Sequence, residues 1–404
     1  MSPPWITVVG LGEDGRDSLS PKASAAIDAA VHLVGAERHF AILGKVKGES
    51  HAWPTPLGGI FEEIARWRGT PTVILATGDP MTFGIGKALL DHFAPDEMTV
   101  LPQLSAFTLA AARLKWPLQH VDTVSLHGRP SCLIEPLIAP GNRIIALTSD
   151  RTTIAEVALR LCRRGFDTSR LTVLEHMNGK AERVTRFAAA DTELQQPFAD
   201  FQTLAIECRA GPDAVILPRI PGLPDSAFRH DGQLTKREVR AATLAALMPS
   251  PHRLLWDIGA GCGSIAIEWM RAARNARAIV FEQVPERLAM ISANAAALGT
   301  PSLSIVPGSA PASLAGQPSP DAVFIGGGVS DEAIFAAVWP RLTPGGMLVA
   351  NTVTLEGNAR LAELQQSHGG DLVGIDIAYL EQLGSRRGLR PRMPVLQWRV
   401  QKPW

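Results

Sequence analysis

Short hydrophobic runs alternate with amphipathic segments along most of the chain. In the first half, runs suited to strands begin at residues 6, 31, 72, 99, 142, 171 and 201. Helical spacing of apolar positions follows several of them. Examples are 21–30, which Pro21 can start, and 154–165, where Gly165 suits the C-terminal cap. This alternation predicts an α/β unit with two lobes over about 210 residues.

The second half continues the alternation in a different arrangement. A helix is predicted over 234–249, followed by a strand, a glycine-rich turn, a helix and a second strand over 254–282. Further strands are expected over 302–311, 321–328, 345–353, 371–380 and 393–400. Seven strands with intervening helices and a closing pair near the end predict a Rossmann-like sheet.

Length and local composition divide the chain into domains. Its 404 residues exceed what one hydrophobic core usually supports. Residues 210–234 are rich in Pro and Gly and have no sustained period, which is typical of a junction. We therefore expect one domain over 1–212, a linker over 213–233 and a second domain over 234–404.

Charge and cysteine usage exclude several classes of partner. Lys plus Arg and Asp plus Glu each number 39, and there is no basic run, so nucleic acid is not an expected partner. The chain lacks an apolar run of roughly 18 residues and a leader-like start, which favours a cytoplasmic location away from membranes. Four scattered cysteines indicate reduced core thiols, and no metal site is expected.

Residues 254–282 are the most informative stretch for function. A strand leads into Gly259, Gly261 and Gly263, a helix follows, and the next strand ends on Glu282. This is the layout of a nucleoside-binding unit, in which the terminal carboxylate accepts hydrogen bonds from ribose hydroxyls. A dinucleotide site would need a small residue where Ser264 stands. The tighter G-x-G-x-G spacing resembles class I S-adenosylmethionine (SAM) methyltransferases.

The class I resemblance implies further contacts around this turn. Cofactor-binding candidates are Thr235, Gly259, Ala260, Gly261, Cys262, Gly263, Glu282, Ser309 and Ala310. Ser309 stands where many class I enzymes have an Asp beside the adenine. Gly327, in a GGG loop after a strand, is expected to lie flat against a bulky substrate. Lys236, Arg237 and Arg240 either contact ligand or form a solvated helix start.

Five short strings, four of which contain glycine, occur in order through the first half. They are VVGLGEDG, LVGAERHF, ATGDPMTFGIG, LSAFTLAAARL and VSLHGRP. In this order they resemble the class III tetrapyrrole methylases, which bind SAM between two α/β lobes. The resemblance implies cofactor contacts at Gly10, Gly78, Asp79, Pro80, Ser105 and Ala106. It departs at Glu13–Asp14, where many relatives have Pro-Gly. His127 and Arg129 are interpreted as a buried turn histidine and a surface arginine, and a catalytic role for the pair is the alternative.

A class III lobe pair joined to a class I domain, through the string at 223–240, resembles the decarboxylating precorrin-6Y methyltransferases of cobalamin biosynthesis. The resemblance implies methylation of a reduced tetrapyrrole (precorrin-6Y/6B) at ring carbons 5 and 15. It also implies loss of carbon dioxide from the ring C acetate, giving precorrin-8X. The N-terminal half would serve carbon 5 and the C-terminal half carbon 15 and the decarboxylation. Two SAM sites per chain and a homo-oligomer are expected.

The substrate's carboxylates imply arginines in the clefts. Residues 386–393 carry Arg386, Arg387, Arg390 and Arg392 and are expected in a loop between the last two strands. Arg390 and Arg392 are the candidate substrate-positioning residues, and a solvated basic loop is the alternative. A SAM-dependent RNA methyltransferase and a SAM- or NAD-binding module without catalysis remain the competing functions.

Overall fold

The computed structural model describes residues 4–54, 57–191 and 197–404 and divides into two compact units. One unit comprises the chain up to Ser131 together with Pro140–Ala214. The other comprises Cys132–Ala139 and Val215–Trp404. Among the described residues, no helix has the length and apolar character needed to cross a membrane.

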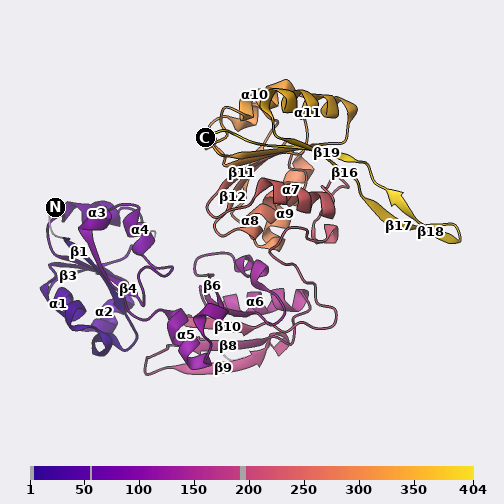
Figure 1. The fold of residues 1–404 in the computed structure, drawn as a ribbon. Helices are drawn as coiled ribbons and strands as arrows, with labels where there is room; N and C mark the ends of the chain where they lie inside the picture. Colours follow the sequence, from indigo (N-terminus) through magenta and orange to yellow (C-terminus); the bar gives the residue numbers. More distant parts are fainter. Residues whose placement is uncertain (1–3, 55–56, 192–196) are drawn as a thin grey trace. The chain divides into compact units, whose positions relative to one another are not determined.

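The first lobe of the first unit is a parallel sheet in the order β3-β2-β4-β1-β5. Helices α1 and α2 contribute to the apolar core on one face, and α3 and α4 to the core on the other (Figure 1). The elements are β1 Ile6–Leu11, α1 Pro21–Ala29, β2 His32–Gly35, α2 Glu37–Leu43, β3 Glu49–Ala52, α3 Ile60–Arg66, β4 Thr72–Thr77, α4 Gly86–Leu90 and β5 Met98–Leu101.

The second lobe is a mixed sheet in the order β6-β7-β10-β8-β9, in which only β6 and β7 pair in parallel. Helix α5 packs its apolar face on the central strands. The elements are α5 Ala106–Leu114, β6 Asp122–Ser125, β7 Arg143–Leu147, α6 Thr152–Arg163, β8 Arg170–Glu175, β9 Arg183–Ala188 and β10 Gln202–Glu207. Gly165 follows α6 with φ of 72°, as predicted for its C-terminal end.

The second unit contains the predicted seven-stranded sheet, in the order β13-β12-β11-β14-β15-β19-β16. Strand β19 is antiparallel to both of its neighbours, and the other pairs are parallel. The strands are β11 Leu254–Ile258, β12 Arg277–Glu282, β13 Ser304–Pro307, β14 Ala322–Ile325, β15 Met347–Thr352, β16 Asp371–Ile375 and β19 Val395–Gln401. The fold class predicted from the sequence is confirmed.

Helices cover both faces of this sheet (Figure 1). Helices α7 Arg237–Leu247, α8 Ser264–Ala272 and α9 Pro285–Leu298 enclose one apolar core, while α10 Glu332–Val338 and α11 Leu355–His368 enclose the other. Because both faces are covered, the central parallel strands are mostly apolar, and the buried Asp257 of β11 is an exception. Polar groups that could meet a ligand are therefore left to the strand ends.

Residues 386–393 do not form the predicted loop. Strands β17 Ala378–Leu383 and β18 Arg386–Pro391 make an antiparallel hairpin that extends away from the seven-stranded sheet (Figure 1). The expectation of one continuous strand over 371–380 was also wrong, because β16 ends at Ile375. Three of the six residues of β18 are arginines, and this polar composition hid a strand whose apolar Leu389 is exposed.

Candidate functional site

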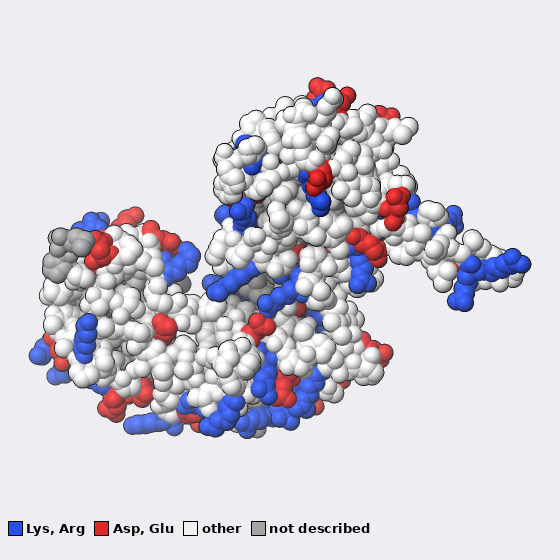
Figure 2. Space-filling view, viewed as in Figure 1, with Lys and Arg blue, Asp and Glu red and all other residues white. Residues whose placement is uncertain are grey.

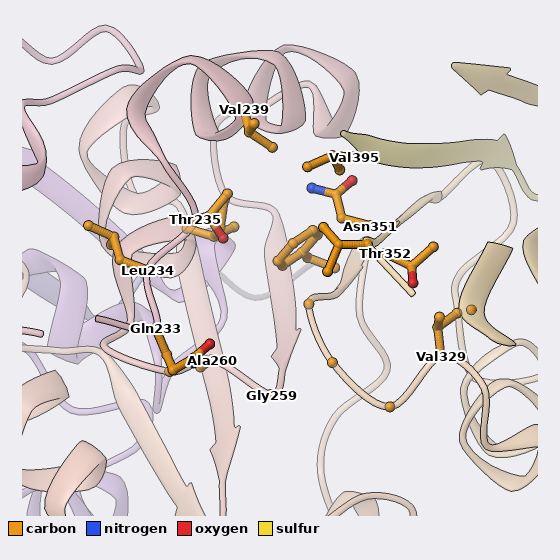
Figure 3. Close-up of a pocket in the computed structure, with 18 of the residues that line it drawn as sticks. Gln233, Leu234, Thr235, Val239, Gly259, Ala260, Val329, Asn351, Thr352 and Val395 are labelled. Carbon is orange, nitrogen blue, oxygen red and sulfur yellow. The ribbon is translucent and has the colours of Figure 1, made fainter. Parts of the chain in front are cut away.

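A cavity of about 1010 Å³ lies at the carboxyl edge of the seven-stranded sheet. This edge is where doubly wound sheets bind their ligands. Figure 3 shows Gln233–Thr235 and Gly259–Ala260 on one side of it, and Asn351, Thr352 and Val329 on the other. The remaining lining comes from Glu282, the loop at 308–310, the glycines at 326–328 and the base of the β17–β18 hairpin.

The glycine turn brings bare backbone to the cavity. Gly259 and Gly261 have φ of 70° and 60°, a conformation that other residues rarely adopt. A Cβ on Gly259 would lie 3.2 Å from the backbone nitrogen of Gly327, so the turn and the GGG loop touch. Gly259, Ala260, Gly261 and Gly327 all line the cavity.

Two residues of the same motif face the protein interior instead. Cys262 is buried in the apolar core between the sheet and its helices. A Cβ on Gly263 would lie 3.1 Å from the Ile291 side chain of α9. Neither Cys262 nor Gly263 is among the residues that line the cavity. Their side of the turn packs the helix onto the sheet.

Glu282 ends β12 beside the glycine turn. Its Oε2 accepts a hydrogen bond from the Gly261 N–H at 2.9 Å, and its Oε1 accepts from the N–H groups of Gln283 and Val284 at 3.0 Å each. The residue is 4% exposed and lines the cavity. Glu282 therefore has two roles: it fixes the turn, and it presents a carboxylate at the position expected for a ribose.

Asp257 lies one step deeper, in β11. Burial raises the pKa of its carboxyl to about 7, with the Glu282 charge acting in the same direction. Its Oδ2 accepts a hydrogen bond from the Ala266 N–H at 3.2 Å, which opposes the shift. Its Oδ1 accepts no hydrogen bond from the described part of the chain. The strand preceding the glycine turn thus contains a carboxyl that changes protonation near neutral pH.

The junction segment before α7 is held in place by a buried ion pair. Arg240 is fully buried and donates to Glu268 Oε1 at 2.7 Å, and Glu268 also accepts from the N–H groups of Gly222 and Leu223. The guanidinium further donates to the carbonyl of Thr235. Arg240 is therefore neither a ligand contact nor part of a solvated helix start, whereas Arg237 is exposed.

The segment from 222 to 236 consequently lies against the glycine turn. The Gln233 carbonyl oxygen is 3.2 Å from where a Cβ on Gly261 would stand. Thr235 and Lys236 line the cavity, as do Gln233 and Leu234, which sequence reasoning did not select. These residues belong to the second compact unit. They lie where the predicted linker, 213–233, meets the predicted second domain.

A buried amide network supports the wall opposite the turn. Asn351 Nδ2 donates to Thr243 Oγ1 at 2.8 Å, and Gln397 Nε2 donates to Asn351 Oδ1 at 3.0 Å. Asn351 and its neighbour Thr352 line the cavity at the end of β15. Sequence reasoning missed both, although Asn-Thr directly after an apolar strand is a usable signal at this edge.

The remaining candidates of this half lie around the rim. Ser309 is exposed and Ala310 partly buried, and both line the cavity beside β13. Arg390 and Arg392 line it from the hairpin, where they pair with Glu381 at 3.2 and 3.0 Å. Figure 2 shows other basic side chains farther along the same hairpin.

Tyr379, the chain's single tyrosine, also lines the cavity from the hairpin. Its hydroxyl donates to Glu238 Oε2 at 2.5 Å, and the Arg392 guanidinium carbon lies 5.2 Å from its ring centroid. The bond from Tyr379 lowers the pKa of Glu238. These contacts tie the base of the hairpin to α7. Sequence reasoning did not select Tyr379, because its partners are distant in the chain.

In the first unit, three strand-end loops meet at the carboxyl edge of the parallel sheet. A Cβ on Gly10 would lie 2.0 Å from the Gly78 carbonyl oxygen, and a Cβ on Gly78 would lie 3.4 Å from the Ser105 Cα. Ser105 caps α5 by accepting from the Thr108 N–H at 3.2 Å, and Ala106 begins the helix. The loops after β1, β4 and β5 therefore lie side by side.

The loop after β4 is ordered by its own carboxylate. Asp79 accepts from the Met81 N–H at 2.9 Å and from the Thr82 hydroxyl at 2.6 Å, and Pro80 is buried. All six N-terminal candidates lie in these loops or at the adjoining strand and helix ends. Three of these candidates, Asp79, Ser105 and Ala106, are partly exposed to solvent. The other three, Gly10, Gly78 and Pro80, are buried.

The departure at Glu13–Asp14 has a structural role. Glu13 pairs with Arg38 at 3.4 Å and with His176 at 3.2 Å, and Asp14 accepts from the Asn178 amide. The turn after β1 thereby binds the second lobe.

His127 is exposed, with Nδ1 3.1 Å from the Thr148 carbonyl oxygen, so the expectation of a buried histidine was wrong. Arg129 is exposed as expected.

In comparisons with known proteins, the two halves of the chain match two different families. Residues 6–192 match the pattern of the tetrapyrrole (corrin/porphyrin) methylases, and residues 226–402 match a precorrin methyltransferase domain. A Sinorhizobium protein named precorrin-6Y C(5,15)-methyltransferase (decarboxylating) is 46% identical over 396 residues. That alignment covers 98% of this chain and 96% of the relative.

Two Salmonella typhimurium proteins each match less than half of the chain. One, named cobalt-precorrin-7 C(5)-methyltransferase, is 31% identical, and the alignment covers 44% of this chain and 88% of that protein. The other, named cobalt-precorrin-6B C(15)-methyltransferase (decarboxylating), is 32% identical over 42% of this chain and 89% of its own length.

The fold and the glycine turn define a methyltransferase in which a two-lobed tetrapyrrole methylase fold precedes a class I domain. The near-complete match to the Sinorhizobium protein then specifies the assignment. The chain belongs to the family of decarboxylating precorrin-6Y C(5,15)-methyltransferases.

Proposed function

We propose that this protein uses SAM to methylate a reduced corrinoid precursor, precorrin-6Y or 6B, at ring carbons 5 and 15. In the same reaction sequence it removes the carboxyl group of the ring C acetate, giving precorrin-8X in cobalamin biosynthesis. Family membership supports the type of reaction. The charge of the second-unit cavity supports the substrate.

The observation that carries the proposal is the set of ionisable side chains that line this cavity. Among the described residues, its charged lining consists of Lys236, Arg287, Arg390, Arg392 and one carboxylate, Glu282. An excess of cations is complementary to a macrocycle bearing many carboxylates.

The chain's residues would act mainly by positioning. Glu282 and the bare turn at Gly259–Gly261 fit the ribose and the adjacent part of SAM, which supplies the methyl group. Ligand pockets commonly measure about 300–1,000 Å³, so a cavity of about 1010 Å³ has room for the cofactor and part of a macrocycle. An electron-rich ring carbon can attack the methyl group in line when both are held and water is excluded, which lowers the barrier by several kcal/mol.

We further propose two SAM sites in each chain. The site in the first unit lies at the loops that contain Gly10, Gly78 and Ser105, and the second lies at the glycine turn. Two unrelated glycine-rich edges support this stoichiometry, and so do the names of the Salmonella relatives, which divide C(5) from C(15) methylation. Isothermal titration of the full chain with SAM should give about two equivalents. One equivalent would contradict the proposal and would favour the competing single-site RNA methyltransferase.

The reaction itself is tested on the full chain with the reduced precursor, SAM and mass spectrometry. Two added methyl groups and the loss of one carbon dioxide are expected. One added methyl group without decarboxylation, or no reaction, would contradict the proposed function.

The four cysteines form no disulfide, which supports the cytoplasmic location that the sequence suggested.

A homo-oligomer is also proposed. The paired side chains of Leu380 and Leu389 lie on the extended hairpin and are 60% and 70% exposed. An exposed apolar pair on a protruding hairpin favours contact with another copy of the chain. Light scattering after gel filtration should give a mass above one chain, lowered by the Leu380→Lys and Leu389→Lys changes together. A monomeric parent protein would contradict this expectation.

A further inference from the structure

Two histidines and a glutamate gather at the edge of the first lobe, and none of them is among the residues proposed to bind SAM. His32 is the first residue of β2, Glu49 the first of β3, and His51 lies two residues further along β3. The parallel register pairs His32 with Glu49 and Val34 with His51. Because side chains alternate between faces, His32, Glu49 and His51 project from the same face of the sheet.

The three potential ligand atoms form a nearly regular triangle. His32 Nδ1 lies 3.2 Å from His51 Nε2, and Glu49 Oε2 lies 3.6 Å from the first and 3.7 Å from the second. Zinc held at about 2.0–2.1 Å by tetrahedral ligands keeps those ligands about 3.3–3.4 Å apart. The triangle therefore matches three corners of a tetrahedron without rearrangement of the strands.

Neighbouring side chains hold the imidazole rings in place. Trp67 stacks on His32 with ring centroids 4.1 Å apart and planes 11° apart, and it lies 4.5 Å from the His51 ring. The other nitrogen of His51, Nδ1, faces Glu63 Oε1 of α3 at 4.0 Å. At this distance the Glu63 carboxylate makes no hydrogen bond to the ring, but its negative charge lies beside the site and favours a bound cation.

We propose that His32, Glu49 and His51 form a binding site for a divalent transition metal ion, with Zn²⁺ the best fit. Two imidazoles and one carboxylate are a donor set that zinc commonly takes, and they leave its fourth position for water. The side chains of His32 and His51 are 15% and 16% exposed, while Glu49 is 69% exposed, so an ion can enter from solvent.

A metal ion at this site would stabilise the fold of the first lobe and would not take part in methyl transfer. Register places His32 opposite Thr72, the start of β4, whereas the Gly78 loop follows the other end of that strand. The five steps from Thr72 to Thr77 separate the two ends of β4 by about 17 Å, so the ion lies too far away to touch a ligand at the Gly78 loop. A bound ion would instead fasten the four-residue edge strand β3 to β2.

The test uses the full chain, first stripped with a chelator and then titrated with Zn²⁺ against a chromophoric competitor. The parent protein should bind one equivalent. His32→Ala and His51→Ala should each weaken binding by about 100-fold or more, since loss of an outer partner alone costs about 10- to 100-fold. The matched control is His120→Ala, an exposed histidine of the second lobe, which should bind zinc as the parent does.

Two further measurements distinguish a metal site from a pair of imidazoles that only share a hydrogen bond. Co²⁺ in place of Zn²⁺ should give the strong visible absorption of a four-coordinate site in the parent but not in His51→Ala. Zinc should raise the melting temperature of the parent and of Glu49→Gln, the latter by less. Equal zinc affinity in the parent and both histidine variants, or no binding by the folded parent, would overturn the proposal.

Discussion

At the scale of single residues, Glu282 combines the support of the glycine turn with the proposed contact to SAM. Glu282→Ala removes the carboxylate and should weaken SAM binding at the second-unit site by about tenfold or more, since charge-assisted hydrogen bonds contribute about 1.5–3 kcal/mol. Titration calorimetry should show that the first-unit site is unchanged. Glu286→Ala, an exposed glutamate on the following helix, is the matched control. Unchanged affinity in Glu282→Ala would place the ribose contact elsewhere.

Asp257 predicts a pH dependence of stability. Its pKa of about 7 in the folded chain exceeds the unfolded value of about 3.9, so the folded state binds the extra proton. Its contribution is therefore full below about pH 4 and is lost as pH rises towards 7. Urea unfolding of the second unit should show this loss in the parent and a flatter profile in Asp257→Asn.

The control for this experiment is Asp371→Asn, which changes an exposed carboxylate in the same unit. Its pH profile should follow that of the parent protein. Parallel profiles for the parent and Asp257→Asn between about pH 4 and 8 would show that Asp257 does not titrate in this range.

At the scale of elements, the β17–β18 hairpin and the residue that follows it bring two cations, Arg390 and Arg392, to the cavity. Arg390→Ala or Arg392→Ala should raise the Michaelis constant for the precursor by about two- to fivefold with little change in SAM affinity. Partly exposed ion pairs are worth up to about 1 kcal/mol, and 1.4 kcal/mol is a factor of ten.

The same hairpin provides matched controls. Arg386 and Arg387 are exposed on β18 but do not line the cavity, so their replacement by Ala should leave the Michaelis constant unchanged. If all four arginine variants raised it equally, a general effect of positive charge would explain the result. The specific clamp by Arg390 and Arg392 would then be wrong.

At the scale of the whole molecule, the two units predict a division of labour. The segment 215–404 should add one methyl group and release one carbon dioxide, and the segment 1–214 should add one methyl group and release none. The Salmonella relatives, which each match less than half of the chain, support the view that either activity can exist alone. Mass spectrometry of the products of each segment, and calorimetry for one SAM per segment, provide the measurement.

The structure sets the position of the cut. A start at residue 224 would remove Leu217 and Leu223 from the core, together with the N–H bonds that Glu268 accepts from Gly222 and Leu223. A mixture of the two segments is the control, because Cys132–Ala139 groups with the second unit. Decarboxylation by segment 1–214 would reverse the assignment and remove the basis for the arginine clamp.

The sequence by itself predicted most of the strands and helices, the glycine turn and the carboxylate at its side, but not β3, β6, β9 or the β17–β18 hairpin. These features depend on local rules, namely apolar periodicity and the backbone freedom of glycine, which operate over a few residues. Glu282 could be selected because a strand end has a fixed place in such a unit. The hairpin was missed because an exposed strand that is rich in arginine resembles a solvated loop.

Only the tertiary structure decided which distant side chains meet. It buried Arg240 against Glu268, which lies 28 positions away, and joined Asn351 to Thr243 across 108 positions. It also brought His32 and His51 within 3.2 Å across two strands. Such pairs depend on strand register and helix packing, in which every residue between them takes part, so no local pattern specifies them.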